Sequence, residues 1–161
     1  MSRGSWIDLF LFLHVMGAIA GVGPSLTYGM WVARTQRLAP EATAWVLRMV
    51  HVIDRRLATP ALAAQAVTGT ALIVLERWRL AHARWLDVGI GLYVVVMVAA
   101  LALVGPLARR RLALAERGGR QGPPEVAAEF EAASRRLRPL LGVVSILTVT
   151  ILYLMIVKPS L

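Results

Sequence analysis

The chain has 161 residues, of which 58% are hydrophobic and 17% are charged, with a formal net charge of +9 and no cysteine. Soluble domains are about half apolar and about a quarter charged, and disordered chains hold far fewer apolar residues, so both classes are disfavoured. The absence of cysteine excludes disulfides, thiolate metal sites, covalently attached haem and cysteine nucleophiles.

Four stretches carry no Asp, Glu, Lys or Arg: Leu9–Ala33, Leu57–Leu75, Val88–Ala108 and Pro139–Val157. A helix crosses the hydrocarbon core with about 20 apolar residues, and each stretch is about that long. In lipid, backbone groups must pair within their own segment, so these stretches should be helices. We therefore predict an all-α, four-transmembrane-helix bundle: one integral membrane domain, 1–161, with spans at about 7–33, 57–76, 86–108 and 139–157.

The first apolar stretch also has features of a secretory signal peptide. Arg3 precedes an apolar segment, and Ala18–Ala20 mimics a cleavage site. The apolar run continues to Ala33, however, which is longer than a signal peptide needs, so a membrane helix is favoured.

The basic residues are unevenly distributed between the two sides that four spans would create. The first and third connections hold 13 of them, and the remaining regions hold 5: Arg3, Arg77, Arg79, Arg84 and Lys158. Because positive residues accumulate on the cytoplasmic side, we predict a bacterial inner-membrane protein with both termini outside. Trp6, Trp78 and Trp85 at the outer boundary and Trp31 at the inner one are typical of an aromatic belt.

The positive charge also suggests a partner. The arginines flank membrane segments, which predicts contact between the basic cytoplasmic face and anionic lipid headgroups. Nucleic acid is disfavoured, because the sequence shows no stacking platform and no recognition motif.

The two halves of the sequence resemble each other. Val22-Gly23-Pro24 is matched by Val104-Gly105-Pro106, and Pro40-Glu41 by Pro124-Glu125. This pattern indicates a parallel two-fold repeat of membrane helix, cytoplasmic amphipathic segment and membrane helix. Chance similarity in a sequence rich in Ala, Leu, Val and Arg is the alternative.

The cytoplasmic segments, at about 41–56 and 125–138, have apolar stripes at helical spacing. The stripes are Trp45, Val46, Met49, Val52 and Ile53 in the first segment, and Val126, Phe130, Ala133 and Leu137 in the second. Such helices either lie at the membrane surface or extend the membrane helices. Glu131 and Arg135 are spaced to pair, Pro60 and Pro139 predict kinks, and 118–124 reads as a flexible linker.

His14 is the first candidate functional residue, because ionisable groups near mid-membrane usually face the bundle interior. A neutral imidazole can ligate haem iron through one nitrogen, and Gly17 and Gly21 on the same face would leave room for a flat macrocycle. Alternatively, His14 forms a hydrogen bond to a neighbouring helix, and the two glycines serve helix packing. His51 is expected near the cytoplasmic interface and His82 in the outer loop, so neither makes a convincing second ligand for the same haem. A methionine could be the second axial ligand, but the sequence does not favour any one of them.

A second polar group comprises Gln65, Thr68, Ser145 and Thr148 within the predicted spans. In lipid such groups find partners on adjacent helices, so Gln65 should bond to the first or fourth helix. Ser145 and Thr148 are candidate partners for Gln65. A path for a small solute or ion is the alternative to this structural role.

Two short motifs carry a resemblance to known families. They are Leu13–Ala18 followed by Gly21–Pro24, and Thr59-Pro60 followed by Gln65–Gly69. With these motifs the chain resembles an uncharacterised bacterial family of predicted four-helix integral membrane proteins. It is more remotely similar to copper-resistance D proteins and HemJ-type protoporphyrinogen oxidases. The HemJ-type resemblance implies a haem-binding role for a first-helix histidine, and His14 alone carries across.

Three functional hypotheses follow. The first is a b-type haem or porphyrin site at His14, for electron transfer or porphyrin oxidation. The second is a non-enzymatic membrane scaffold or accessory subunit, either a homo-oligomer or part of a larger complex. The third is a small-solute or ion pathway lined by the polar groups.

Overall fold

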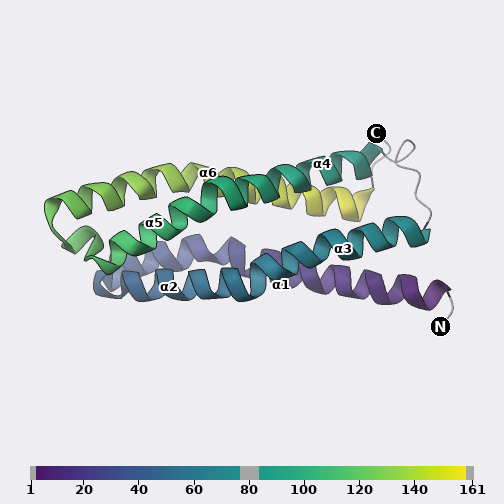
Figure 1. Ribbon diagram of the computed structural model, residues 1–161, viewed down its shortest axis with the longest axis horizontal. Coiled ribbons are helices and arrows are strands. Elements are labelled where there is room, and N and C mark those ends of the chain that lie inside the picture. Colours follow the sequence, from purple (N-terminus) through teal and green to yellow (C-terminus); the bar gives the residue numbers. More distant parts are fainter. Residues whose placement is uncertain (1–2, 77–83, 159–161) are drawn as a thin grey trace.

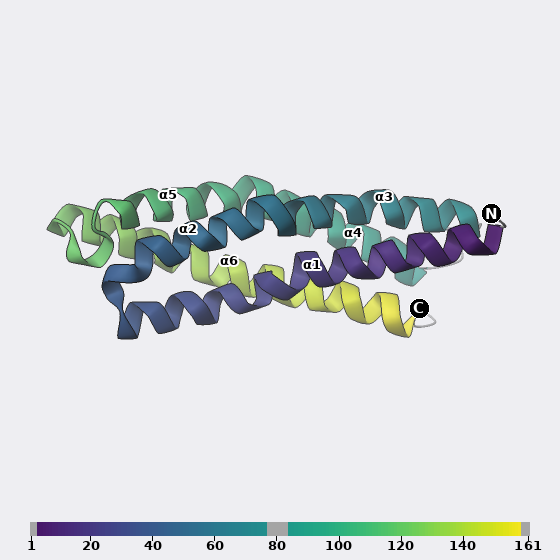
Figure 2. The same ribbon diagram turned by 90° about the horizontal axis from the view of Figure 1, so that it is seen from below.

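The computed structural model of the protein describes residues 3–76 and 84–158. Within these ranges every regular element is helical, and four helical rods are long and apolar enough to cross a membrane: Arg3–Leu38, Pro40–Glu76, Arg84–Glu116 and Pro124–Val157. The rods run along the long axis of the molecule (Figures 1 and 2). The predicted all-α fold with four candidate membrane helices is therefore confirmed.

The chain folds as two helical hairpins. The first comprises α1 (Arg3–Leu38), η1 (Pro40–Ala42), α2 (Thr43–Ile53), η2 (Asp54–Ala58) and α3 (Thr59–Glu76). The second comprises α4 (Arg84–Ala99), η4 (Ala100–Val104), α5 (Gly105–Glu116), η5 (Gly119–Gln121) and α6 (Pro124–Val157). The beginning of α1 and the end of α6 lie together, at what we call the terminal end (Figure 1). The hairpin turns, 39–43 and 117–123, form the opposite turn end. That the hairpins are copies of one repeat stays a prediction.

Two wide helical turns accommodate prolines. The η2 and η4 segments are π-helical, and Pro60 and Pro106 each follow two residues after such a segment ends. Proline lacks an N–H and clashes with the carbonyl four residues earlier, and a wider turn relieves both problems. Pro139, where a kink was predicted, lies inside a continuous α6. The disturbance at Pro106 was not foreseen.

The helices pair chiefly within each hairpin, α1 on α3 and α4 on α6, whereas α2 and α5 bring the hairpins together at the turn end. Nearer the terminal end, the Tyr93 hydroxyl on α4 donates a hydrogen bond of 2.6 Å to the Leu62 carbonyl on α3. This bond links the apolar parts of the two hairpins.

The hydrophobic core lies at the turn end. It contains Val32, Leu47, Leu114, Ala115, Val126, Phe130 and Ala133, contributed by α1, α2, α5 and α6. The four residues of the predicted stripe in 125–138 are all buried, and Phe130 is only 1% exposed. Both amphipathic segments extend the membrane helices, since each rod has 33 to 37 residues and is therefore about 50–55 Å long.

The predicted stripe of the first amphipathic segment lies mostly outside the core, although Val46 packs against it. Trp45 is 63% exposed, whereas Leu47, which the stripe omits, is buried. With Trp31 and Arg34, residues Trp45, Val46, Met49 and Ile53 instead line an open groove of about 480 Å³ between α1 and α2. Helical spacing identifies an apolar face but does not say which neighbour it meets.

The predicted flexible linker is a compact turn. Gly118 and Gly119 have φ values of 107° and 54°, and a Cβ on Gly118 would lie 2.7 Å from the Gly122 Cα. These left-handed positions need glycine, because a side chain there is strained. The turn also places Arg120 on Glu131, so the expected Glu131–Arg135 pair is replaced by a Glu131–Arg120 ion pair.

The apolar segments turn most of their side chains outward. In each rod, only 6% to 11% of the most apolar window is buried inside the protein. Ile146 and Ile156, for example, are 67% and 80% exposed. Surfaces of this kind are unfavourable in water, but they match a hydrocarbon solvent.

Candidate functional site within the membrane helices

His14 and two side chains of α3 form a polar cluster between α1 and α3. The His14 Nδ1 lies 2.9 Å from the Thr68 Oγ1, and the Gln65 Nε2 donates a hydrogen bond of 2.7 Å to the His14 carbonyl. The sequence-based expectation that Gln65 bonds to the first or fourth helix is confirmed for the first helix. Thr68 is buried and His14 is half-buried.

Gly69 on α3 leaves space for the imidazole ring of His14. A Cβ on Gly69 would lie 3.3 Å from the His14 Cε1 and 3.8 Å from its Nδ1. The Cε1–Nδ1 edge of the ring therefore packs against the α3 backbone at Gly69, next to Thr68. The sequence indicated that Gly69 shares a helix face with Gln65 and Thr68, but not that His14 lies against it.

The hydrogen bonds of Thr68 determine which ring nitrogen of His14 carries the proton. The Thr68 Oγ1 is 2.9 Å from the Ala64 carbonyl oxygen, which can accept but cannot donate. The hydroxyl has one proton, so bonding to both groups requires that it donate to Ala64 and accept from His14 Nδ1–H. In the neutral ring, Nε2 then has the free lone pair. The structure of the described residues places no hydrogen-bond donor on Nε2.

Gly17 and Gly21 face α3 at close range. A Cβ on Gly17 would lie 3.3 Å from the Gln65 Nε2, and one on Gly21 would lie 2.9 Å from the Leu62 Cγ. The two glycines thus permit close packing of α1 on α3, which is the structural alternative considered from the sequence. The space beside them is filled by Leu62 and Gln65, so it offers no room for a macrocycle.

The remaining candidates lie elsewhere. Ser145 and Thr148 are on α6, which packs on α4, and the Thr148 hydroxyl donates to the Val144 carbonyl of its own helix. The structure therefore does not bring them to Gln65 and Thr68, and this geometry lends no support to a shared solute path. His51 is on α2, and His82 lies outside the described residues. Within 3–76 and 84–158, no cluster of three His, Asp or Glu residues could hold a metal ion.

In a comparison with protein families, residues 8–159 match the family DUF2269, which is described as a predicted integral membrane protein. The chain belongs to this family. The matched range contains almost the whole of all four helices and every residue of the polar cluster. The predicted resemblance to a family of four-helix integral membrane proteins is thereby confirmed, and the chain is an integral membrane protein of the lipid bilayer. Curated proteins and solved structures give no match.

Proposed function

We propose that this protein of the DUF2269 family binds haem b or a related porphyrin through His14, for electron transfer or porphyrin oxidation in the membrane. The observation that carries the proposal is the hydrogen bond between His14 Nδ1 and Thr68. Histidines that bind metals almost always donate their second ring N–H to an oxygen acceptor, which fixes the tautomer and the orientation of the ring. Thr68 is such an acceptor, and it leaves Nε2 as the nitrogen for iron.

The residues around His14 fit this role in their chemistry. An imidazole nitrogen is a common axial ligand of haem iron, and a bound haem would supply one-electron redox chemistry. Thr68 holds the proton on Nδ1, Gln65 fixes the backbone of α1 at His14, and Gly69 makes room for the ring. Because α3 covers the glycine face, a porphyrin would approach His14 from another side.

A non-enzymatic scaffold or accessory subunit is the second candidate. It is favoured by the observation that His14, Gln65 and Thr68 bond to one another while Gly17 and Gly21 pack on α3. Such a pair of helices is a complete packing unit without any ligand. The outward apolar faces and the arginine-rich turn end would then serve contacts with lipid, with a second copy or with a partner subunit.

An absorbance spectrum separates the two candidates. The protein is expressed with ample haem precursor, purified in detergent, and measured before and after reduction with dithionite. We expect a Soret band that shifts on reduction, and we expect His14→Ala to lose it while keeping its helical circular dichroism. His51→Ala is the matched control and should retain the band. Wild type without any bound porphyrin, or His14→Ala with full occupancy, would overturn the haem proposal and favour the scaffold.

Thr68→Val tests the role of the hydroxyl separately from the ligand itself. Valine keeps the shape of threonine but cannot accept the Nδ1–H bond. We expect porphyrin binding to persist with 10- to 100-fold lower affinity, about the usual cost of losing such an outer partner. A variant that binds as tightly as the wild type would show that Thr68 does not position the ligand.

The same proposal includes a location and an orientation, the bacterial inner membrane with the turn end in the cytoplasm and both termini outside. The 13 basic residues of the first and third connections between the predicted spans support this orientation. Since the chain has no cysteine, single cysteines can report the topology cleanly. In intact cells, Gly4→Cys should react with an impermeant maleimide and Ala128→Cys should not; the reverse pattern would invert the orientation.

A further inference from the structure

Unpaired polar groups collect at the turn end. Among the described residues, the enclosed side-chain atoms without a hydrogen-bond partner are the Tyr28 hydroxyl, the Gln36 Nε2, the Arg111 Nε and the Ser134 Oγ. Gln36 and Arg111 lie around Phe130, and Ser134 follows Phe130 by one helical turn on α6. The Arg111 guanidinium is 5.5 Å from the centre of the Phe130 ring, and Gln36 and Phe130 line the same cavity. All three groups can donate hydrogen bonds, so a hydrogen-bond acceptor bound nearby would satisfy them.

Arg111 is the most costly of these groups to leave unpaired. It is 8% exposed, and the part of the chain that the structure describes offers it no ion pair. A buried charge without a counter-charge is strongly unfavourable. Burial, together with the nearby charges of Arg138 and Arg120, lowers the pKa of Arg111 to about 10, so it still carries its proton at neutral pH.

The surroundings of Arg111 are positively charged overall. Arg138 and Arg120 both act on it electrostatically, and Glu131 is the one carboxylate that does so. Glu131 is already engaged, because it forms an ion pair with Arg120. Arg135 also acts on Glu131 electrostatically, so four guanidinium groups share a single carboxylate and positive charge is in excess.

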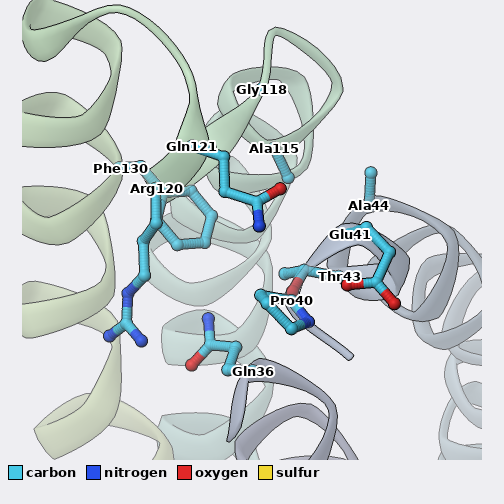
Figure 3. A pocket seen from close by; sticks show the side chains of 11 residues that line it. Gln36, Pro40, Glu41, Thr43, Ala44, Ala115, Gly118, Arg120, Gln121 and Phe130 are labelled. Carbon is cyan, nitrogen blue, oxygen red and sulfur yellow. The ribbon is translucent and has the colours of Figure 1, made fainter. Parts of the chain in front are cut away.

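A cavity adjoins the cluster. It has a volume of about 140 Å³ and is lined by Arg120, Gln36, Gln121 and Phe130 and by the carboxylate of Glu41 (Figure 3). Of the residues in the cluster, Arg120 lines it, whereas Arg111, Ser134 and Arg138 do not. Arg138 and Arg120 are exposed, whereas Arg111 and Ser134 are buried, so the cluster has a buried floor and an open rim. Arg138 also directly precedes the uncharged stretch that begins at Pro139. The rim thus reaches the depth at which lipid headgroups begin.

We propose that the α5–α6 face of the turn end binds a phosphate group through Arg111, Arg120 and Arg138, with the Ser134 hydroxyl as a further donor. Arginine is suited to this ligand, because its planar guanidinium can donate two parallel hydrogen bonds to phosphate oxygens. The phosphate belongs either to an anionic lipid headgroup or to a soluble molecule. This inference does not depend on the proposed role of His14.

Thermal unfolding of the detergent-purified protein, followed by tryptophan fluorescence, tests the proposal. One arm titrates sodium phosphate against sodium chloride at constant ionic strength. The other titrates phosphatidylglycerol into the micelles, with phosphatidylcholine as the reference. A ligand that binds the folded state raises the midpoint in a saturable way, from which an apparent Kd follows. A shift with both probes assigns a free phosphate group, and a shift with phosphatidylglycerol alone assigns a headgroup.

Charge variants at the rim make the test specific without disturbing buried Arg111. We expect Arg138→Gln to weaken binding about tenfold. Arg136→Gln removes the same charge from an exposed position of the same helix, at a residue that does not act on Arg111, and should change binding little. Glu131→Gln removes the competing carboxylate and should strengthen binding, a gain that misfolding cannot imitate.

Three results would overturn the proposal. The first is the absence of a saturable shift with either probe. The second is an equal loss in the Arg136→Gln and Arg138→Gln variants, which would indicate a diffuse charge effect. The third is binding to Glu131→Gln that is no stronger than binding to the wild type.

Discussion

Replacing Gly21 by alanine would test how closely α1 and α3 pack in the membrane. The added Cβ would lie 2.9 Å from the Leu62 Cγ, 3.0 Å from its Cδ2 and 3.4 Å from its backbone nitrogen. The first of these atoms is close to the backbone of α3, so rotation of the side-chain tip cannot relieve the contact. The helices must separate by a few tenths of an ångström, or Leu62 must leave its rotamer.

The expected magnitude follows from two opposing effects. Overpacking of this kind costs about 1–3 kcal/mol, whereas replacing glycine by alanine inside a helix gains about 0.5–1 kcal/mol. Gly29 separates the two effects, because it lies on the same helix, a Cβ there meets nothing within 4 Å, and no proline follows it. Gly29→Ala should therefore show the gain alone, and Gly21→Ala should be less stable than Gly29→Ala by about 1–3 kcal/mol.

The assay is unfolding of the purified variants by sodium dodecyl sulfate in mixed micelles, followed by circular dichroism. Wild type, Gly21→Ala and Gly29→Ala are titrated side by side, and the free energies of unfolding are compared. If the two variants unfold at the same detergent fraction, the close approach of α1 and α3 at Gly21 is refuted. The conclusion that α3 packs closely enough on α1 to position His14 would then also be refuted.

Three further predictions use the same kind of measurement. Gln65→Met removes the bond to the His14 carbonyl and should lower the free energy of unfolding by about 0.6 kcal/mol, the average for such bonds in membranes; a neutral result would mean that this bond is not formed. Gly118→Ala forces a side chain into φ 107° and should cost about 1–2 kcal/mol in thermal unfolding, and a neutral result would contradict the turn. The bond from Arg120 lowers the pKa of Glu131 below its usual 4.5, so the ionised form stabilises the fold above that pH. This contribution is lost as the pH falls through the lowered pKa, so the wild type should lose more stability than Glu131→Gln on acidification, and parallel pH profiles would contradict the pair.

The fold could be predicted from the sequence because an uncharged apolar stretch of about 20 residues can satisfy its backbone hydrogen bonds in lipid only as a helix. The stripe around Phe130 was also predictable, since all of its members repeat at helical spacing. The stripe containing Trp45 could be predicted as an apolar face, but its neighbour in the fold could not. Its spacing is as regular, but Leu47 meets the core instead, and periodicity within one helix does not identify the neighbouring helix.

The candidate site could be predicted only in part. A glutamine in lipid needs a partner, which predicted a bond from Gln65 to the first or fourth helix, and the structure selects the first. The role of Gly69 and the proton on Nδ1 of His14 depend on the register between α1 and α3. That register follows from contacts between two helices, such as those of Gly21 with Leu62, and no pattern within one helix contains it.

The helices are held together in two different ways along their length. At the turn end, apolar side chains such as Phe130 are removed from water, and the hydrophobic effect drives their association. In the membrane, lipid tails are as apolar as leucine, so association depends on close backbone packing and hydrogen bonds. Val32 and Leu47 belong to the core and lie on the same rods as His14 and Thr68. Contacts in the core therefore also help to fix the register of these rods. This explains how hydrogen bonds of about 0.6 kcal/mol each can orient an imidazole, because they choose its rotamer without having to hold the helices together.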